Sequence, residues 1–287
     1  MIENLRGIHE TVVFKSNSNV LLYDNVEFEE YPSHWHTPLE IIMPLENEYT
    51  INCSGHVFTL RVGDIFLICP GVLHTLYASK GRRIIFQAEL MNSAPFKELE
   101  SVLSIISPAI LITPENSPAI YQTLHRYLLE IRDEYCNDIS LSESAIYARL
   151  IEMLVLIGRN HTENPNRFDV GLTKQKEYID KFMNICNYIS EHCTEDLTLD
   201  GMAALAGYSK YHFTRLFKQF TNISFYKYIN LKRIATAEKL LIDPDISVTD
   251  AALRSGFTSL SAFIRMFKLI NHCTPSEFRN MYTTFKP

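Results

Sequence analysis

Two stretches, AALAGYSKYHFTRLFKQF (203–220) and AALRSGFTSLSAFIRMFKLI (251–270), share one pattern and decide the fold of the chain's last third. The aromatic and basic positions of the first recur 50 residues later: Phe213, Arg215, Phe217 and Lys218 correspond to Phe263, Arg265, Phe267 and Lys268. Upstream the offset is 49, because the second stretch has one extra residue in its turn. Such a repeat indicates two copies of one supersecondary unit.

Each copy has the residues of a helix-turn-helix, at about 198–220 and 247–270. In the first, Thr198 can cap a short helix, Gly207 can end it with a positive φ, and Ser209 can cap a second helix. Apolar residues at helical spacing predict one buried face on each second helix: Phe213, Leu216, Phe217 and Phe220, then Phe263, Met266, Phe267 and Ile270.

The opposite face of each second helix is expected to point outward. It carries Lys210, Tyr211, Thr214, Arg215 and Lys218 in the first copy, and Leu260, Ser261, Ile264, Arg265 and Lys268 in the second. Outward Leu260 and Ile264 favour an interface, although apolar residues at such positions can also be buried.

The segment between the copies, FYKYINLKRIATAEKLLI (225–242), lacks Gly and Pro and predicts a linking helix. Its 18 residues would span roughly 27 Å, against about 34 Å between successive major-groove faces on one side of DNA. Two second helices on this strut could enter adjacent groove segments. Helix-turn-helix geometry also occurs in ordinary bundles, but the repeat and the strut together favour DNA binding.

The rest of the composition is typical of a two-domain chain: 287 residues, 46% hydrophobic and 21% charged. Residues 1–170 carry 12 Lys and Arg against 22 Asp and Glu, whereas residues 171–287 carry 15 against 11, so only the second half suits a polyanion. With no apolar run of membrane length and no signal-peptide pattern, we expect a cytoplasmic protein. The six scattered cysteines are expected to be free thiols.

Residues 1–94 predict a β-barrel or sandwich preceded by a short N-terminal arm. YTINCS and HVFTLRV flank a Ser54-Gly55 turn as in a hairpin, and GDIFLICPG and RRIIFQAEL predict further strands. Helical periodicity marks residues 95–160, where LSESAIYARLIEMLVLIGRN is expected to pack on the barrel or on a partner subunit. Residues 161–173 are the expected linker, and 174–287 the helical domain.

The stretch HWHTPLE (34–40) contains His34, His36 and Glu40, and a later strand supplies His74. Alternate residues of a strand share a face, so His34 and His36 can both point inward. Such a set suits Zn, Fe, Mn or Ni, but it can also line an effector pocket or hydrogen-bond within the barrel. We favour an effector pocket over a metal, and we expect no catalytic residue and no resident cofactor.

From about Thr194 to Arg279 the sequence resembles the DNA-binding domain of the AraC/XylS family of bacterial transcription regulators. The matching pieces are LTLDGMAALAGYSKYHFTRLFK, ATAEKLL, GFTSLSAFIRMFK and CTPSEFR, and the last two form the family's signature. HWHTPLEI and VGDIFLICPGVLHTL resemble the family's common sensor, a cupin barrel. The resemblance implies an α+β chain, in which a cupin-like barrel and a helical dimerisation region precede an all-α domain of two helix-turn-helix units joined by a linker helix.

The resemblance also implies roles for single residues. Bases would be faced by Tyr211, Thr214 and Arg215 in the first unit and by Leu260, Ser261, Ile264 and Arg265 in the second, and phosphates by Lys210, Lys218 and Lys268. The family usually has Gly at Asn222 and His272, where we expect left-handed caps because Asn and His tolerate positive φ. Gly201 replaces a usual Glu, at an expected cost of up to about 1 kcal/mol.

These observations predict a ligand-responsive regulator of transcription and not an enzyme. We expect a homodimer formed through residues 115–160, promoter DNA and RNA polymerase as partners, no membrane, and activation of a sugar or metabolite operon by a small effector, most simply a sugar. A repressor of the same family and a cupin metalloenzyme with a helical accessory domain are the alternatives.

Overall fold

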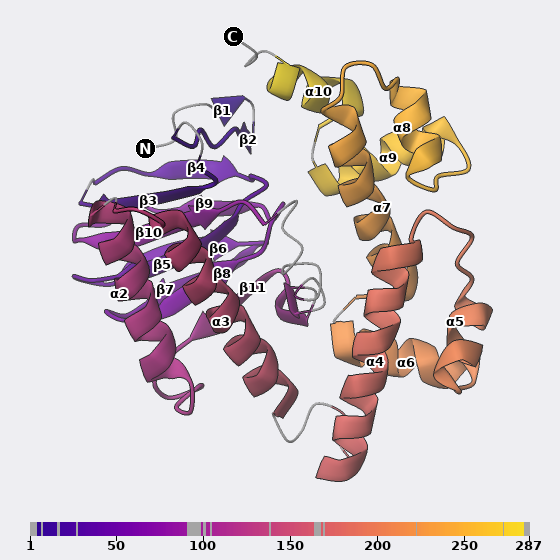
Figure 1. Cartoon of the computed structure of the whole chain (residues 1–287), viewed down its shortest axis with the longest axis horizontal. Helices are drawn as coiled ribbons and strands as arrows, with labels where there is room; N and C mark the ends of the chain where they lie inside the picture. Colours follow the sequence, from indigo (N-terminus) through magenta and orange to yellow (C-terminus); the bar gives the residue numbers. More distant parts are fainter. Residues whose placement is uncertain are drawn as a thin grey trace. The chain divides into compact units, whose positions relative to one another are not determined.

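The computed structural model describes residues 5–6, 8–15, 18–26, 28–90, 99, 102–103, 105–137, 139–163, 168, 170–221, 223–271 and 273–283 (Figure 1). The chain divides into two compact units, residues 1–164 and 165–287. The first unit contains the β structure and the second is helical, which confirms the predicted fold class.

The first unit is built on two antiparallel sheets. The larger has the order β11 (Ala109–Ile112), β8 (Ile65–Ile68), β5 (Leu39–Pro44), β10 (Arg83–Ala88) and β3 (Val20–Asn25). The smaller has the order β4 (Tyr31–His34), β9 (His74–Leu76), β6 (Tyr49–Cys53) and β7 (His56–Leu60), and β1 (Leu5–Arg6) pairs with β2 (His9–Glu10). The predicted hairpin is confirmed, with Ser54 and Gly55 at φ of 51° and 84°.

Strand β5 is buried on both faces, and its alternation divides the core in two. Ile42 joins side chains of both sheets in the interior between them. Leu39, Ile41 and Met43 point the other way and pack against helices. The strand therefore places its remaining polar residue, Glu40, in the interior.

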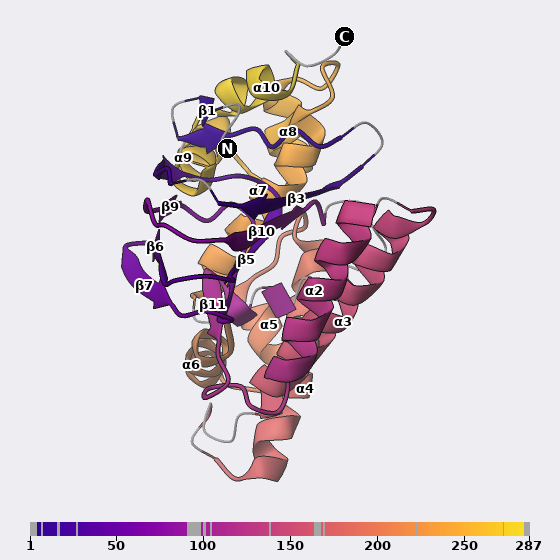
Figure 2. The same cartoon turned by 90° about the vertical axis from the view of Figure 1, so that its left-hand side faces the viewer.

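Helices α2 (Tyr121–Asn137) and α3 (Ser142–Glu163) lie side by side over the outer face of the larger sheet (Figure 2). Leu124 and Leu128 of α2 and Leu150 and Met153 of α3 are fully buried in the cluster that covers this face. Helix α3 packs on the chain's own barrel, as one of the two predictions had it. None of the described helices combines the length and hydropathy that a membrane span requires.

Two predicted boundaries need correction. The region 95–160 is not wholly helical, because the apolar run Ala109–Ile112 forms β11 and covers the edge of β8. A run of four apolar residues has too little periodicity to distinguish a strand from a helix. The predicted linker 161–173 is also too long, since α3 continues to Glu163, shortly before Pro165, and α4 begins at Leu172.

The second unit consists of α4 (Leu172–His192), α5 (Leu199–Ala206), α6 (Lys210–Thr221), α7 (Phe225–Leu241), α8 (Val248–Arg254), α9 (Leu260–Asn271) and α10 (Pro275–Thr283). The predicted strut is α7, which packs against α6 on one side and against α8 and α9 on the other (Figure 1). Phe182 of α4 packs against α6 of the first helix pair. Its ring centroid lies 5.7 Å from that of Phe213 and 5.9 Å from that of Phe220.

The predicted caps of the first unit are confirmed. The Thr198 hydroxyl accepts a hydrogen bond from the Gly201 amide at 3.0 Å, and Gly207 has φ of 71°. Ser209 Oγ accepts from the His212 amide at 3.3 Å. The left-handed caps predicted at Asn222 and His272 lie outside the described residues.

Two arginines outside the equivalent positions of the repeat anchor the segments before the helix-turn-helix units. Arg233 of α7 donates to the carbonyl oxygens of Cys193 and Glu195, at 2.7 and 2.9 Å, in the loop before α5. Arg279 of α10 donates to the carbonyl oxygens of Leu241, the last residue of α7, and of Ile246, in the loop before α8. Each arginine therefore anchors the backbone segment that leads into one helix-turn-helix.

Candidate nucleic-acid interface and ligand site

Helices α6 and α9 each bury one face and expose the other. Phe213, Leu216, Phe217, Phe220, Phe263 and Phe267 are fully buried, as predicted. Met266 and Ile270 are only half-buried. All ten residues predicted to point outward are exposed: Lys210, Tyr211, Thr214, Arg215, Lys218, Leu260, Ser261, Ile264, Arg265 and Lys268.

The exposed face of α6 is polar, and two of its groups are already engaged. Lys210 Nζ lies 2.9 Å from Asp200 Oδ2, and Thr214 Oγ1 donates to the Lys210 carbonyl at 2.8 Å. Tyr211 projects furthest, with 81% of its surface exposed. Arg215 has no such partner among the hydrogen bonds of the described residues and is available to an external acceptor.

The exposed face of α9 is more apolar. Leu260 and Ile264 expose 38% and 37% of their surface on the face that carries Arg265. Such side chains can contact thymine methyl groups or sugars, while an arginine can pair with guanine. Arg215 and Arg265 occupy equivalent positions of the repeat, so each second helix offers one guanidinium group to the outside.

The second candidate site lies between the two sheets of the first unit. Strand register places Glu40 opposite Gln87 on the larger sheet and His34 opposite His74 on the smaller sheet. His36 follows the end of β4, in the connection to β5. The three histidines and Glu40 are each at most 2% exposed, and we call them the histidine cluster.

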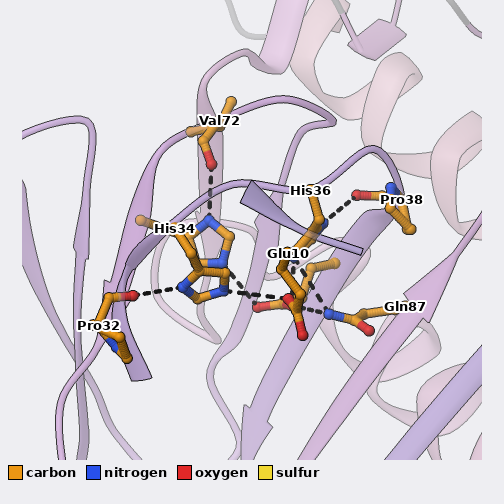
Figure 3. A network of polar contacts seen from close by, with 9 residues as sticks. Glu10, Pro32, His34, His36, Pro38, Val72 and Gln87 are labelled. Carbon is orange, nitrogen blue, oxygen red and sulfur yellow. Dashed lines mark hydrogen bonds and ion pairs between the residues drawn. The ribbon is translucent and has the colours of Figure 1, made fainter. Parts of the chain in front are cut away.

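The backbone fixes the orientation of all three histidine rings (Figure 3). The Nδ1 atoms of His34, His36 and His74 lie 2.7, 3.1 and 2.8 Å from the carbonyl oxygens of Pro32, Pro38 and Val72. Because a carbonyl oxygen only accepts, each Nδ1 carries a proton and donates it. The three Nε2 atoms therefore face the interior, and the rings of His34 and His74 have centroids 4.2 Å apart.

Glu40 lies where these Nε2 atoms converge. Its Oε2 is 3.0 Å from His36 Nε2 and accepts from Gln87 Nε2 at 2.8 Å. Its Oε1 is 3.7 Å from His74 Nε2. A second carboxylate enters from β2, where Glu10 Oε2 lies 3.5 Å from His34 Nε2 (Figure 3).

Burial and the carboxylates divide the cluster into charged and neutral groups. Burial lowers the pKa of His74 to about 3 and also lowers the pKa of His34. Burial opposes a charge on His36 too, but the hydrogen bond and charge of Glu40 outweigh it and raise its pKa. Burial likewise disfavours ionised Glu40, yet His36 and the other histidines bring the Glu40 pKa down to about 2. The cluster thus favours an ionised pair beside two neutral imidazoles.

A cavity of about 20 Å³ adjoins the cluster, with Glu10, Tyr23, Tyr31, His34, Glu40 and Gln87 among its walls. A water molecule needs roughly 10–15 Å³ by this measure. In this conformation the cavity has room for a water molecule or an ion, and a sugar ring would require the walls to move. The predicted sugar effector therefore gains no support from the size of the cavity.

Sequence reasoning missed two of the groups that complete this site. Gln87 is a polar residue on the interior-facing side of an otherwise apolar strand, RIIFQA, and that alternation could have identified it. Glu10 belongs to a strand of two residues that no periodicity could reveal. It reaches the cluster because the Glu10 amide donates to the Trp35 carbonyl at 3.0 Å and the Trp35 amide to the Ile8 carbonyl at 2.9 Å.

Comparison with known proteins assigns a family to each unit. Residues 21–147 match the AraC-like ligand binding domain, and residues 202–281 match a helix-turn-helix domain. The crystal structure of ToxT from Vibrio cholerae O395 superposes with a TM-score of 0.50, covering 94% of this chain and 99% of that chain at 14% identity. At this identity the likeness concerns the fold alone.

The relatives in sequence are regulators. An uncharacterized HTH-type transcriptional regulator of Staphylococcus aureus strain COL is 36% identical over 100 residues, which are 35% of this chain and 13% of the relative's length. The uncharacterized HTH-type transcriptional regulator YbfI of Bacillus subtilis strain 168 is 25% identical over 240 residues, which are 81% of either chain. With an AraC-like ligand-binding domain before a helix-turn-helix domain, the chain belongs to the AraC/XylS family of transcription regulators.

Proposed function

We propose that this chain controls transcription by inserting α6 and α9 into two successive major-groove segments of promoter DNA, in response to a ligand held at the histidine cluster. One observation carries the proposal: two equivalent helices expose their outer faces from opposite ends of a single rigid strut, α7. The strut's 17 residues span roughly 26 Å, so one chain would read two half-sites about one turn of DNA apart.

The exposed residues divide into two roles. Arg215 and Arg265 would read guanine by paired hydrogen bonds, and Tyr211, Thr214, Leu260, Ser261 and Ile264 would contact neighbouring bases. Lys210, Lys218 and Lys268 would neutralise phosphates, which sets affinity and its dependence on salt without selecting sequence. The two half-sites would differ, because α6 offers mainly polar groups where α9 offers Leu260 and Ile264.

Activation, dimerisation and contact with RNA polymerase are further parts of the proposal. The paired helices α2 and α3 have an outer side that a second copy could cover, and we propose a homodimer through this pair. Sedimentation of the full chain at micromolar concentration tests it, and a monomer throughout would exclude the dimer. Activation is distinguished from repression by a reporter gene placed behind the footprinted promoter.

The alternative of a metalloenzyme receives less support than regulation. Beside the histidine cluster the cavity of about 20 Å³ leaves no room for an organic substrate. Two relatives, which match 35% and 81% of the chain, are HTH-type transcriptional regulators.

A footprint of the full chain on promoter fragments tests the DNA-binding part. We expect two protected major-groove segments on one face of the duplex, lost together when Arg215→Ala and Arg265→Ala are combined. Replacing Lys174, an exposed lysine of α4, with Ala removes one charge outside α6 and α9 and should leave the footprint in place. No protection of any promoter fragment, at low or at physiological salt, would overturn the proposal.

A further inference from the structure

The histidine cluster contains two buried polar atoms that face each other without a hydrogen bond. Within the described part of the chain, Glu40 Oε1 and His74 Nε2 have no hydrogen-bond partner. They lie 3.7 Å apart, too far for a direct hydrogen bond, and His74 has already committed Nδ1 to the Val72 carbonyl. Two buried polar atoms without partners cost free energy, and a cation between them would satisfy both.

The other two histidines also turn a ring nitrogen toward the place where a cation would lie. His34 and His36 also commit Nδ1 to carbonyl oxygens and turn Nε2 inward. The ligand atoms of the three histidines all lie within 4.8 Å of one another. Bonds of 2.0–2.1 Å in a tetrahedral arrangement require roughly 3.4 Å between ligand atoms, so small side-chain rotations would bring them to one ion. Backbone acceptors on Nδ1 are the usual outer partners of metal-binding histidines.

Charge also matches a divalent cation. Glu40 is fully buried, and Glu10 Oε2 approaches the cluster at 3.5 Å from His34 Nε2. Imidazoles that bind an ion through Nε2 are neutral ligands, so in an occupied site the negative charge comes from these two carboxylates. An ion of charge +2 would neutralise them in a site that water barely enters.

We propose that His34, His36, His74 and Glu40 bind a divalent first-row transition-metal ion, with Glu10 as the acidic neighbour, and that this ion is the ligand to which the sensor domain responds. Three imidazoles and a carboxylate suit Zn²⁺, Co²⁺, Ni²⁺ or Fe²⁺ and not the oxygen-seeking Mg²⁺ and Ca²⁺. The ion would join β4 and β9 of the smaller sheet to β5 of the larger. This inference rests on the proposed function, because it names the ligand of the same site.

The test uses the untagged full chain, stripped with a chelator and titrated with Co²⁺ and with Zn²⁺. We expect one ion per chain, visible Co²⁺ bands of a four- or five-coordinate nitrogen and oxygen site, and a higher melting temperature. Glu40→Gln and His74→Gln should each weaken binding at least about 100-fold, as expected for direct ligands when loss of an outer partner alone costs 10–100-fold. His56→Gln changes an exposed histidine of β7 and should bind as the unmodified chain does.

The same samples are then tested for DNA binding and for transcription of a reporter with and without Zn²⁺. A response that Glu40→Gln abolishes supports the inference. No metal binding in a chain that still footprints its promoter overturns the metal site and leaves the proposed function standing. Metal binding with no change in DNA affinity or transcription overturns the sensing role, and failure to bind any promoter overturns the proposed function itself. If His74→Gln fails to fold, the isosteric Glu40→Gln supplies the comparison.

Discussion

At the scale of single residues, Arg215 and Arg265 are the sharpest test of sequence reading. Each is exposed at the same position of its repeat, and a guanidinium group that pairs with guanine contributes about 1–3 kcal/mol to discrimination. We therefore expect Arg215→Ala or Arg265→Ala to weaken binding to the specific site roughly 5- to 150-fold, with little loss on unrelated DNA. Fluorescence anisotropy at fixed salt measures both affinities. An equal loss on unrelated DNA would reassign the arginine to a phosphate.

Gln87 acts on the histidine cluster through Glu40. Its amide donates to Glu40 Oε2 at 2.8 Å, which leaves Oε1 turned toward His74. Gln87→Leu should therefore lower the affinity for Co²⁺ by about 10- to 100-fold, the usual effect of losing an outer partner. The Co²⁺ spectrum separates this from unfolding, because a repositioned ligand shifts the bands. Gln122→Leu, at an exposed position of α2, is the control, and equal affinities would contradict the positioning role.

The site was predictable where residue type and spacing carried the information. His34, His36 and Glu40 share seven residues of sequence, and the exposed faces of α6 and α9 follow from helical period. His74 was predictable as a candidate by its chemistry, but its register opposite His34 is a tertiary property. Glu10 and the backbone carbonyls that orient the rings have no signature in the sequence, because they arise from strand pairing at a distance.

At the scale of elements, Gly201 leaves the N-terminus of α5 without a reciprocal capping interaction that the chain does form at α10. In α10, Glu277 occupies the corresponding third position and accepts from the Thr274 amide at 2.7 Å, while the Glu277 amide donates back to Thr274 Oγ1. Gly201→Glu should rebuild this pairing with Thr198 and raise the free energy of unfolding by about 0.5–1.5 kcal/mol.

Urea denaturation of the full chain measures this gain, and Gly201→Ala separates helix propensity from capping. A Cβ atom at Gly201 would lie 3.1 Å from Thr198 Oγ1, so both variants require that hydroxyl to shift slightly. Loss of stability in both variants would show that it cannot shift.

The arginine anchors make a second prediction about elements. Arg233 and Arg279 each donate to two carbonyl oxygens at or beyond the end of the helix that precedes a helix-turn-helix. Replacing either with Met leaves those acceptors without the charged donor, and we expect a loss of about 1.5–3 kcal/mol in unfolding free energy. Arg254→Met removes an exposed arginine of α8 as the matched control. If it proves as costly as the anchor variants, the anchoring role is refuted.

The helical elements were more predictable than the strands. Stretches without Gly or Pro, such as α6 and α7, begin and end within about a residue of their predicted positions. Strand β11 escaped prediction because Ala109–Ile112 is too short to display a period, and it becomes a strand only by pairing with β8. Local signals therefore determine the helical unit, while the sheets depend on contacts distant in sequence.

At the scale of the whole molecule, the acidic and basic residues are distributed unevenly between the ligand-binding half and the DNA-binding half. The acidic residues 1–170, which include the histidine cluster, attract cations and repel DNA, whereas residues 171–287 carry a mild positive excess. The affinity for DNA should therefore fall steeply as the salt concentration rises, and residues 171–287 alone should account for this dependence. Its slope should follow the number of phosphates that Lys210, Lys218 and Lys268 neutralise.

The rigid strut makes the last prediction, which concerns the spacing of the two half-sites. Helix α7 is continuous from Phe225 to Leu241 and packs against helices of both units of the repeat, so it fixes the separation of α6 and α9. Inserting about 5 base pairs between the half-sites should reduce affinity to that of one half-site, because the second half-site turns to the opposite face of the duplex. Inserting about 10 base pairs restores the face but adds roughly 34 Å, which a rigid strut cannot span, so affinity should stay low. Competition binding with the three fragments measures this. Recovery of full affinity with the longer insertion would mean that the two units move independently and that α7 does not act as a ruler.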